Sequence, residues 1–274
     1  MAKKVTFSNC GMDGMLGPDL EKCISFYNVE WVKNSDYFSM PKRGIQKVKI
    51  PISAEFEFTA YGAGRLNYGA MAEAKVKLEI GTEIYIGIGQ QGKYIYDGCG
   101  GTFVAIRENG KFIPIIIAGG AGGGYEGYEM ECGNGSTDQF GNRSNKIEER
   151  NKNIGKEGKS GNYNWYNGGN GFEGRINGYW EYIRKNIYGI YTEETPKSFE
   201  DGLNGGKGKD NGCEGGFGGG GVGGSGGGGG YTGGHGGSNG CGGGGGSFTQ
   251  NGNRIQKGHK DPGLLKIKII KLFN

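Results

Sequence analysis

The chain has 274 residues, of which 64 are glycine and six are proline, with 32 Lys and Arg against 28 Asp and Glu. Glycine is about three times as frequent as in an average protein whereas proline is scarce, which excludes collagen and a Pro-rich linker. The net charge of +4 is spread along the chain without a run of five or more like charges, so we expect no nucleic-acid partner.

We expect no targeting segment at the N-terminus. Lys3 and Lys4 are not followed by an apolar stretch of the length that a signal peptide needs, and no later segment is long enough to span a membrane. We therefore expect no membrane insertion, and an intracellular location if Met1 is the native start.

Alternation of apolar and polar residues predicts a series of half-buried β-strands. In one of them Phe56 and Phe58 share a face while the intervening glutamates face the other way. Asn109-Gly110 predicts a tight turn between two others. The predicted strands cover residues 46–50, 54–61, 74–80, 84–88, 102–107, 112–117 and 264–270. The only candidate helix lies within residues 179–188.

The order of these strands predicts a mainly β protein in a single domain. Because the last strand follows a long glycine-rich stretch, we expect it to return to the first sheet and close a β-sandwich made of about residues 1–117 and 247–274. Polyglycine and loop insertions would then occupy about residues 62–70 and 118–246, with irregular loops in the polar part of the second insertion.

The densest glycine run covers residues 215–246, where 23 of 32 residues are glycine. Its interruptions at Thr232, His235, Ser238 and Cys241 recur every third residue, the period of an extended left-handed helix without internal hydrogen bonds. Without Cβ atoms such backbones can pack side by side and bond to one another. We therefore predict a bundle of polyglycine II helices rather than a flexible linker, with structural glycines at Gly215, Gly219, Gly223, Gly227, Gly233 and Gly243.

The six cysteines leave two readings open. They are widely spaced and contain no C-x-x-C pair, which argues against zinc and redox motifs. In an oxidising compartment three disulfides are natural, with Cys10–Cys23 and Cys213–Cys241 as the expected pairs; in the cytosol the cysteines would be buried thiols.

No motif predicts catalysis. Residues 87–92 fit the dinucleotide pattern G-x-G-x-x-G, but the chain after them does not resemble a helix. His235 and His259 are the only histidines, and the carboxylate pairs at 148–149 and 193–194 are adjacent in sequence rather than facing a common substrate. We expect no catalytic residue, no metal site and no cofactor. The glycosylation patterns at Asn134 and Asn142 have meaning only in a secreted protein.

Aromatic residues crowd into the segment from residue 163 to residue 191, interleaved with Asn and Gly. Such side chains offer a large contact area at a small rotamer cost, which is typical of a recognition surface. They could equally form a local core over the glycine bundle. The predicted binding residues are Tyr163, Trp165, Tyr166, Phe172, Tyr179 and Trp180.

Several ordered stretches resemble the extracellular glycine-rich domain of the anaplastic lymphoma kinase and leukocyte tyrosine kinase receptor family. The most specific are Gly-Gln-Gln-Gly at 89–92 and Ile-Ile-Ala-Gly-Gly at 116–120; others lie at 14–18, 44–51, 60–63, 85–88, 100–104, 197–202, 215–221, 226–234 and 246–248. The resemblance implies a jelly-roll-like subdomain interwoven with polyglycine II helices, an extracellular location and a protein ligand. The loop at 257–261 departs from it, being largely basic where the receptors present acidic residues to a basic cytokine.

The sequence therefore favours a non-enzymatic binding module with a protein partner, or a glycan, held on a rigid polyglycine-supported surface. The alternative is a structural subunit of a larger assembly, either an intracellular scaffold or a phage-type tip adhesin.

Overall fold

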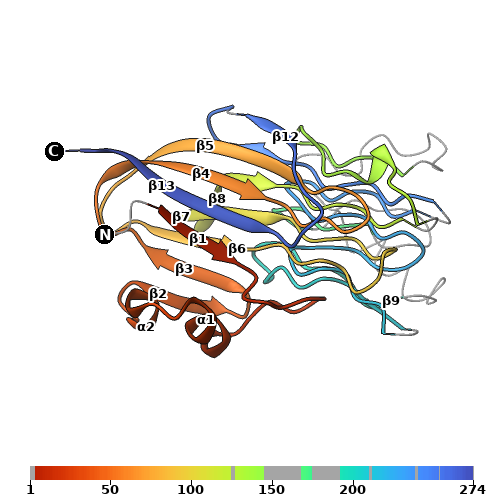
Figure 1. The fold of residues 1–274 in the computed structure, drawn as a ribbon, viewed down its shortest axis with the longest axis horizontal. Helices are drawn as coiled ribbons and strands as arrows, with labels where there is room; N and C mark the ends of the chain where they lie inside the picture. Colours follow the sequence, from red (N-terminus) through yellow and green to blue (C-terminus); the bar gives the residue numbers. More distant parts are fainter. Residues whose placement is uncertain are drawn as a thin grey trace.

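The fold is mainly β, with antiparallel sheets stacked in a sandwich-like arrangement (Figure 1). The computed structural model describes residues 4–124, 127–144, 168–174, 192–209, 212–237, 240–252 and 254–273. The candidate helix at 179–188 lies outside these residues. None of the helices in the described ranges is long and apolar enough to cross a membrane.

The first sheet joins the two ends of the chain. Within the described residues it has five strands in the order β1-β13-β4-β5-β12. Ile267 of β13 lies opposite Val5 of β1 on one side and Phe58 of β4 on the other, which confirms that the last strand returns to the first sheet. The strands are β1 (Lys4–Ser8), β4 (Ala54–Tyr61), β5 (Ala70–Leu78), β12 (Ile255–Lys257) and β13 (Leu264–Leu272).

The second sheet has six strands in the described part of the chain, in the order β11-β8-β7-β6-β3-β2. The predicted turn between β7 and β8 is confirmed: Asn109 and Gly110 have φ values of 49° and 81°, as a tight two-residue hairpin turn requires. The strands are β2 (Phe38–Lys42), β3 (Ile45–Lys49), β6 (Glu83–Gly87), β7 (Thr102–Glu108), β8 (Lys111–Ala118) and β11 (Phe248–Thr249).

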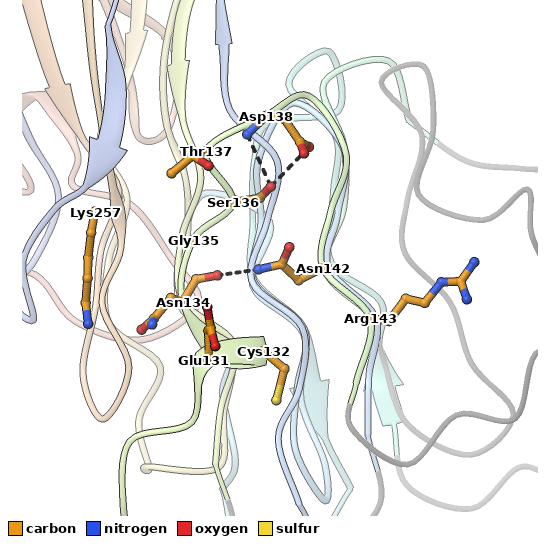
Figure 2. A pocket seen from close by; sticks show the side chains of 10 residues that line it. All are labelled: Glu131, Cys132, Asn134, Gly135, Ser136, Thr137, Asp138, Asn142, Arg143 and Lys257. Atoms are coloured by element: carbon orange, nitrogen blue, oxygen red, sulfur yellow. Dashed lines mark hydrogen bonds between the residues drawn. The ribbon is translucent and has the colours of Figure 1, made fainter.

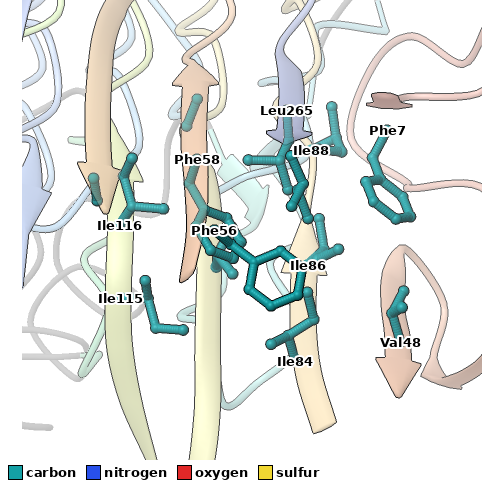
Figure 3. Packing of buried hydrophobic residues seen from close by; sticks show 14 of the residues in the cluster. Phe7, Val48, Phe56, Phe58, Ile84, Ile86, Ile88, Ile115, Ile116 and Leu265 are labelled. Atoms are coloured by element: carbon teal, nitrogen blue, oxygen red, sulfur yellow. The ribbon is translucent and has the colours of Figure 1, made fainter. Parts of the chain in front are cut away.

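The main core lies between the two sheets. Phe58 and Leu265 from the first sheet meet Ile86 and Ile116 from the second, and all four are buried (Figure 3). In β4 buried residues alternate with partly exposed ones, as the period-two pattern of its sequence predicts, whereas residues 84–87 of β6 are all buried because both faces of that strand are covered.

Two helices that the sequence pattern did not predict precede β2, namely α1 (Leu20–Tyr27) and α2 (Glu30–Lys33). Asp19 caps α1 by accepting a hydrogen bond from the backbone N–H of Lys22, and Asn28 ends it in a left-handed conformation. Leu20, Cys23, Ile24 and Tyr27 follow the helical period, but the helix has only eight residues, too few for a pattern-based prediction to separate it from a loop.

The glycine-rich segments extend from the ends of both sheets and lie side by side at the opposite end of the molecule from the chain termini (Figure 1). We call this region the glycine block and define it as residues 98–101, 119–124, 215–221, 226–230, 233–235 and 242–246. Its backbones bond to one another: the N–H of Gly228 donates to Gly243, that of Gly120 to Gly229, and that of Gly245 to Gly120.

At several positions of the glycine block only glycine fits, because another part of the backbone lies too close for a Cβ atom. A Cβ on Gly100 would lie 1.7 Å from the carbonyl oxygen of Phe217, and one on Gly227 would lie 2.1 Å from that of Gly234. Gly219 and Gly223 have φ values of 83° and 85°, so the chain turns at both positions and the run of 215–246 is not one continuous extended helix.

Among the other predicted structural glycines, a Cβ on Gly215 would lie 2.1 Å from the carbonyl oxygen of Gly220 and one on Gly243 would lie 1.8 Å from that of Asn142, and Gly233 is buried. A second apolar cluster, which includes Phe103, Phe199 and Phe217, packs on the outer face of the six-stranded sheet. It contains side chains of both the sheet and the glycine block, and so holds the two together. Short elements complete the described chain: η1 (Glu131–Gly133), β9 (Thr192–Glu194) and β10 (Lys207–Gly208).

Candidate binding surface

A cluster of charged and aromatic side chains lies where β12 meets the start of β5. Lys257 pairs with Ala70 in the sheet, which brings its side chain beside Tyr68. The Nζ atoms of Lys257 and Lys260 lie 3.9 and 4.6 Å from the centre of the Tyr68 ring, as in a cation–π contact. Glu129 bonds to both, at 2.6 Å from Lys257 and 3.2 Å from Lys260. We call these four residues the basic cluster.

The basic cluster is accessible and positively charged. Half of the Lys257 side chain and 38% of that of Lys260 are exposed. The hydrogen bond from Lys257 lowers the pKa of Glu129, so this carboxylate stays ionised. Two ammonium groups against one carboxylate leave an excess of one positive charge.

The loop between Lys257 and Lys260 carries a histidine that is neutral near pH 7. The ring of His259 packs edge-on against Tyr61, with the ring centres 4.8 Å apart, and its Nδ1 lies 3.4 Å from Asp261. Burial lowers the pKa of His259 below its ordinary value, and the nearby Asp261 carboxylate only partly opposes this effect. The positive charge of this surface therefore comes from its lysines.

A pocket of about 550 Å³ adjoins the basic cluster (Figure 2). Lys257 lies on one side of it and Arg143 on the other, while Asn134 and Asn142 face each other between them. Polar side chains predominate in its lining, which consists of Glu131, Cys132, Asn134, Gly135, Ser136, Thr137, Asp138, Asn142, Arg143 and Lys257.

The pocket wall is attached to the last segment of the glycine block. The N–H groups of Ser136 and Asn142 donate to Gly245 and Gly244, and the N–H of Gly244 donates to Cys132. A Cβ on Gly244 would lie 1.9 Å from the carbonyl oxygen of Asn134, so the wall and the block are in direct backbone contact. The pocket is therefore preformed rather than assembled from free loops.

Hydrogen bonds fix the two amide groups of the pocket. The Oδ1 of Asn134 accepts from the N–H of Tyr68, which turns its Nδ2 the other way. The Nδ2 of Asn142 donates to the carbonyl oxygen of Asn134, which leaves its Oδ1 as the remaining acceptor. Both residues belong to the predicted glycosylation patterns, and only Asn142 has its side-chain nitrogen bonded within the described chain.

The cysteine pairing differs from the expectation for Cys241. Cys241 forms a disulfide with Cys132, so the expected Cys213–Cys241 pair is wrong. Cys213 instead lies 3.9 Å from the hydroxyl of Tyr96. The glycine block brings Cys132 and Cys241 together from positions 109 residues apart, a proximity that sequence spacing does not reveal.

Cys10 and Cys23 are free thiols with their Sγ atoms 3.2 Å apart, both buried under α1. The hydrogen bond with Cys23 lowers the pKa of Cys10, whereas that of Cys23 is raised. Cys99 is also a buried thiol, and burial raises its pKa to about 11.

Phe172 is the one predicted binding residue within the described chain. It is 3% exposed and stacks on Phe199 with ring centres 5.1 Å apart, as part of the second apolar cluster. Tyr163, Trp165, Tyr166, Tyr179 and Trp180 lie outside the described residues.

Among the described residues, those considered for catalysis are not gathered into a site; the carboxylate pair at 148–149 lies outside the described residues. His235 is buried, and Glu193 is ion-paired with Lys207 at 2.8 Å. After the G-x-G-x-x-G stretch the chain enters turns, and Gln90 donates to the carbonyl oxygens of residues 14 and 16. Among the described residues there is no group of three or more His, Cys, Asp or Glu that could hold a metal ion.

Sequence reasoning singled out the basic loop but missed Tyr68 and Glu129. Neither lies in a recognisable motif, and both are far from Lys257 along the chain. The signal that could have found Tyr68 is the pairing of β12 with β5, which depends on knowing the register of a three-residue strand.

Comparison with known proteins finds partial similarity to a receptor. No protein-family model matches the chain. A stretch of 119 residues is 29% identical to the leukocyte tyrosine kinase receptor of Mus musculus, covering 38% of this chain and 13% of the receptor. The chain thus spans a small part of the length of this relative.

Proposed function

We propose that this protein is a non-enzymatic binding module of the receptor glycine-rich type, which recognises an acidic protein partner through the basic cluster. The observation that carries the proposal is the exposed pair Lys257 and Lys260 on the Tyr68 ring, both ion-paired with the single carboxylate of Glu129. The partial identity to a protein named as a receptor supports a binding role.

The chemistry of the cluster favours an acidic partner. Excess positive charge at an exposed surface attracts carboxylates and speeds association. The aromatic ring beneath the ammonium groups supplies apolar area that a purely charged patch lacks. The receptors that this chain resembles present acidic residues to a basic cytokine in the loop that corresponds to residues 257–261. Because this loop is largely basic in the present chain, we infer an acidic partner.

The glycine block is proposed to serve as the rigid support of this surface. We propose that its segments form a polyglycine II bundle, interrupted by turns, interwoven with a jelly-roll-like sandwich in one domain spanning residues 1–274. The backbone bonds between residues 98–101, 119–124, 226–230 and 242–246 support this proposal, as do the close glycine contacts. A support without side-chain freedom limits the entropy lost on binding.

The aromatic residues Tyr163, Trp165, Tyr166, Tyr179 and Trp180 are proposed as further contacts with the protein partner. Their role rests on composition alone and is independent of the basic cluster.

Affinity capture from native material, followed by mass spectrometry, tests the proposal. The wild-type protein is compared with the double variant Lys257→Glu/Lys260→Glu. We expect an acidic protein to be captured by the wild type, to be lost with the double variant, and to be released as the salt concentration rises.

The control is Lys4→Glu/Lys22→Glu, which changes the net charge equally at exposed positions elsewhere on the surface. It should retain the partner. Equal capture by the wild type and the charge-reversed cluster, with both folded, would rule out the basic cluster as the contact surface.

A further inference from the structure

The pocket beside the basic cluster has its own chemistry. Its volume of about 550 Å³ lies within the range of small-molecule sites. No large apolar side chain contributes to its lining, so it offers little to an aromatic or aliphatic anchor of a protein partner. A ligand for this pocket must therefore be recognised by hydrogen bonds.

The charges of the pocket cancel. Arg143 and Lys257 are opposed by Glu131 and Asp138, and Lys257 is already bonded to Glu129. An anion would gain little here, and a cation would meet two positive groups at the rim. The lining thus favours an uncharged ligand.

The groups left for a ligand alternate between donors and acceptors. Asn134 offers its Nδ2 and Asn142 its Oδ1, because the other half of each amide is bonded within the wall. Asp138 accepts from Ser136 and from the N–H of Phe140 through Oδ1, which leaves Oδ2 as an acceptor. Glu131 and Arg143 make no side-chain bond to any described residue.

Hydroxyl groups match such a lining because each one both donates and accepts a hydrogen bond. Neighbouring hydroxyls on a sugar ring can bridge a planar amide or carboxylate and a nearby donor at the same time. We propose that this pocket binds an uncharged saccharide, one or two rings in size. The inference rests on the proposed binding function and adds a second class of ligand to it.

Because the pocket wall is attached to the glycine block, hydrogen bonds that are individually weak are enough to hold a ligand. The disulfide Cys132–Cys241 and the bonds to residues 244 and 245 hold the amide groups in place before a ligand arrives. A preformed site loses little entropy on binding.

The test uses the full chain, labelled with ¹⁵N and made in a host that adds no N-glycans, since Asn134 and Asn142 stand in glycosylation patterns. Methyl mannoside, methyl galactoside, N-acetylglucosamine and lactose are titrated separately while amide shifts are recorded. We expect at least one sugar to shift amides of residues 131–143, with a dissociation constant on the order of 1 mM.

Two variants identify the pocket as the site. Glu131→Gln and Arg143→Ala remove groups that hold nothing else in the described chain, and each should weaken sugar binding by about tenfold, as expected for bonds to charged groups. Lys111→Ala, at the exposed start of β8, is the matched control and should bind as the wild type does.

The proposal is overturned if no neutral sugar shifts residues 131–143, if only a charged sugar such as glucuronate does so, or if both variants bind with unchanged affinity. Both variants leave Lys257 and Lys260 in place. Capture of an acidic partner by Arg143→Ala therefore separates a failure of the sugar site from a failure of the proposed function.

Discussion

The disulfide between Cys132 and Cys241 joins η1, at the wall of the pocket, to the residue that directly precedes the last segment of the glycine block. We expect Cys132→Ser/Cys241→Ser to lower the free energy of unfolding by about 2–4 kcal/mol, because the broken bridge closes a long loop in the unfolded chain. Urea unfolding without reductant measures this change. Cys213→Ser is the control and should shift stability by about 0.5 kcal/mol or less; equal stability of all three proteins would contradict the expectation.

The contact between Gly244 and Asn134 makes the pocket wall sensitive to a single methyl group. In Gly244→Ala the new Cβ would lie 1.9 Å from the Asn134 carbonyl oxygen, a backbone atom that cannot rotate away. We expect a loss of more than about 3 kcal/mol of stability, beyond the usual cost of overpacking.

The matched control for that prediction is Gly110→Ala, where a Cβ meets nothing within 4 Å and only the left-handed backbone opposes the change. Its expected cost is about 1 kcal/mol. If thermal or urea unfolding finds the two variants equally stable, the pocket wall moves to accommodate the new methyl group at residue 244. The binding surface would then lack a rigid support.

Asp97 makes the stability of the protein depend on pH. Burial, more than the nearby Glu214, raises its pKa to about 7, although its Oδ2 accepts hydrogen bonds from the N–H groups of Tyr94 and Glu214. Its Oδ1 is buried without a partner in the described chain. The folded protein thus holds this proton more tightly than the unfolded chain, whose Asp pKa is about 4.

It follows that the contribution of Asp97 to stability is greatest below about pH 4, falls as the pH rises toward 7, and stays constant above that. Asp97→Asn mimics the protonated carboxyl and should raise stability at pH 8 relative to the wild type, by on the order of a few kcal/mol, with little difference at pH 4. Urea midpoints across this range measure the effect; parallel curves for the two proteins would mean that Asp97 does not hold a proton in the folded state.

Strands such as β4 could be predicted because burial alternates along them, as at Phe56 and Phe58. The strands β1, β2, β11 and β12 were not predicted, because each has at most five residues and too little alternation to be recognised. The helix α1 was missed although Leu20, Cys23, Ile24 and Tyr27 follow the helical period, because it is only eight residues long and its end signals, Asp19 and Asn28, are common in turns. The partner of Cys241 was beyond prediction because the folding of the glycine run sets it. Only part of the basic cluster could be predicted. Lys257 lies in a recognisable basic loop, but Tyr68 is brought beside it only by the pairing of β12 with β5.

Cys10 and Cys23 are placed to form a second disulfide. Their Sγ atoms are 3.2 Å apart, and the lowered pKa of Cys10 increases the share of the reactive thiolate. We expect mild oxidation to join them, so that an alkylating reagent applied after unfolding labels two thiols fewer than before oxidation. Cys10→Ser should abolish this change. Unaltered labelling of both cysteines after oxidation would leave the expected Cys10–Cys23 bridge without support.

The aromatic segment allows stability and binding to be separated. Phe172 is buried against Phe199, so Phe172→Ala should cost about 3–5 kcal/mol of stability through the cavity that it leaves. Trp165→Ala/Trp180→Ala, by contrast, should leave the unfolding midpoint nearly unchanged and weaken capture of the protein partner by about tenfold or more, as for hot-spot aromatics. If the double variant instead unfolds early and binds normally, these tryptophans belong to a local core, and the partner is held by the basic cluster alone.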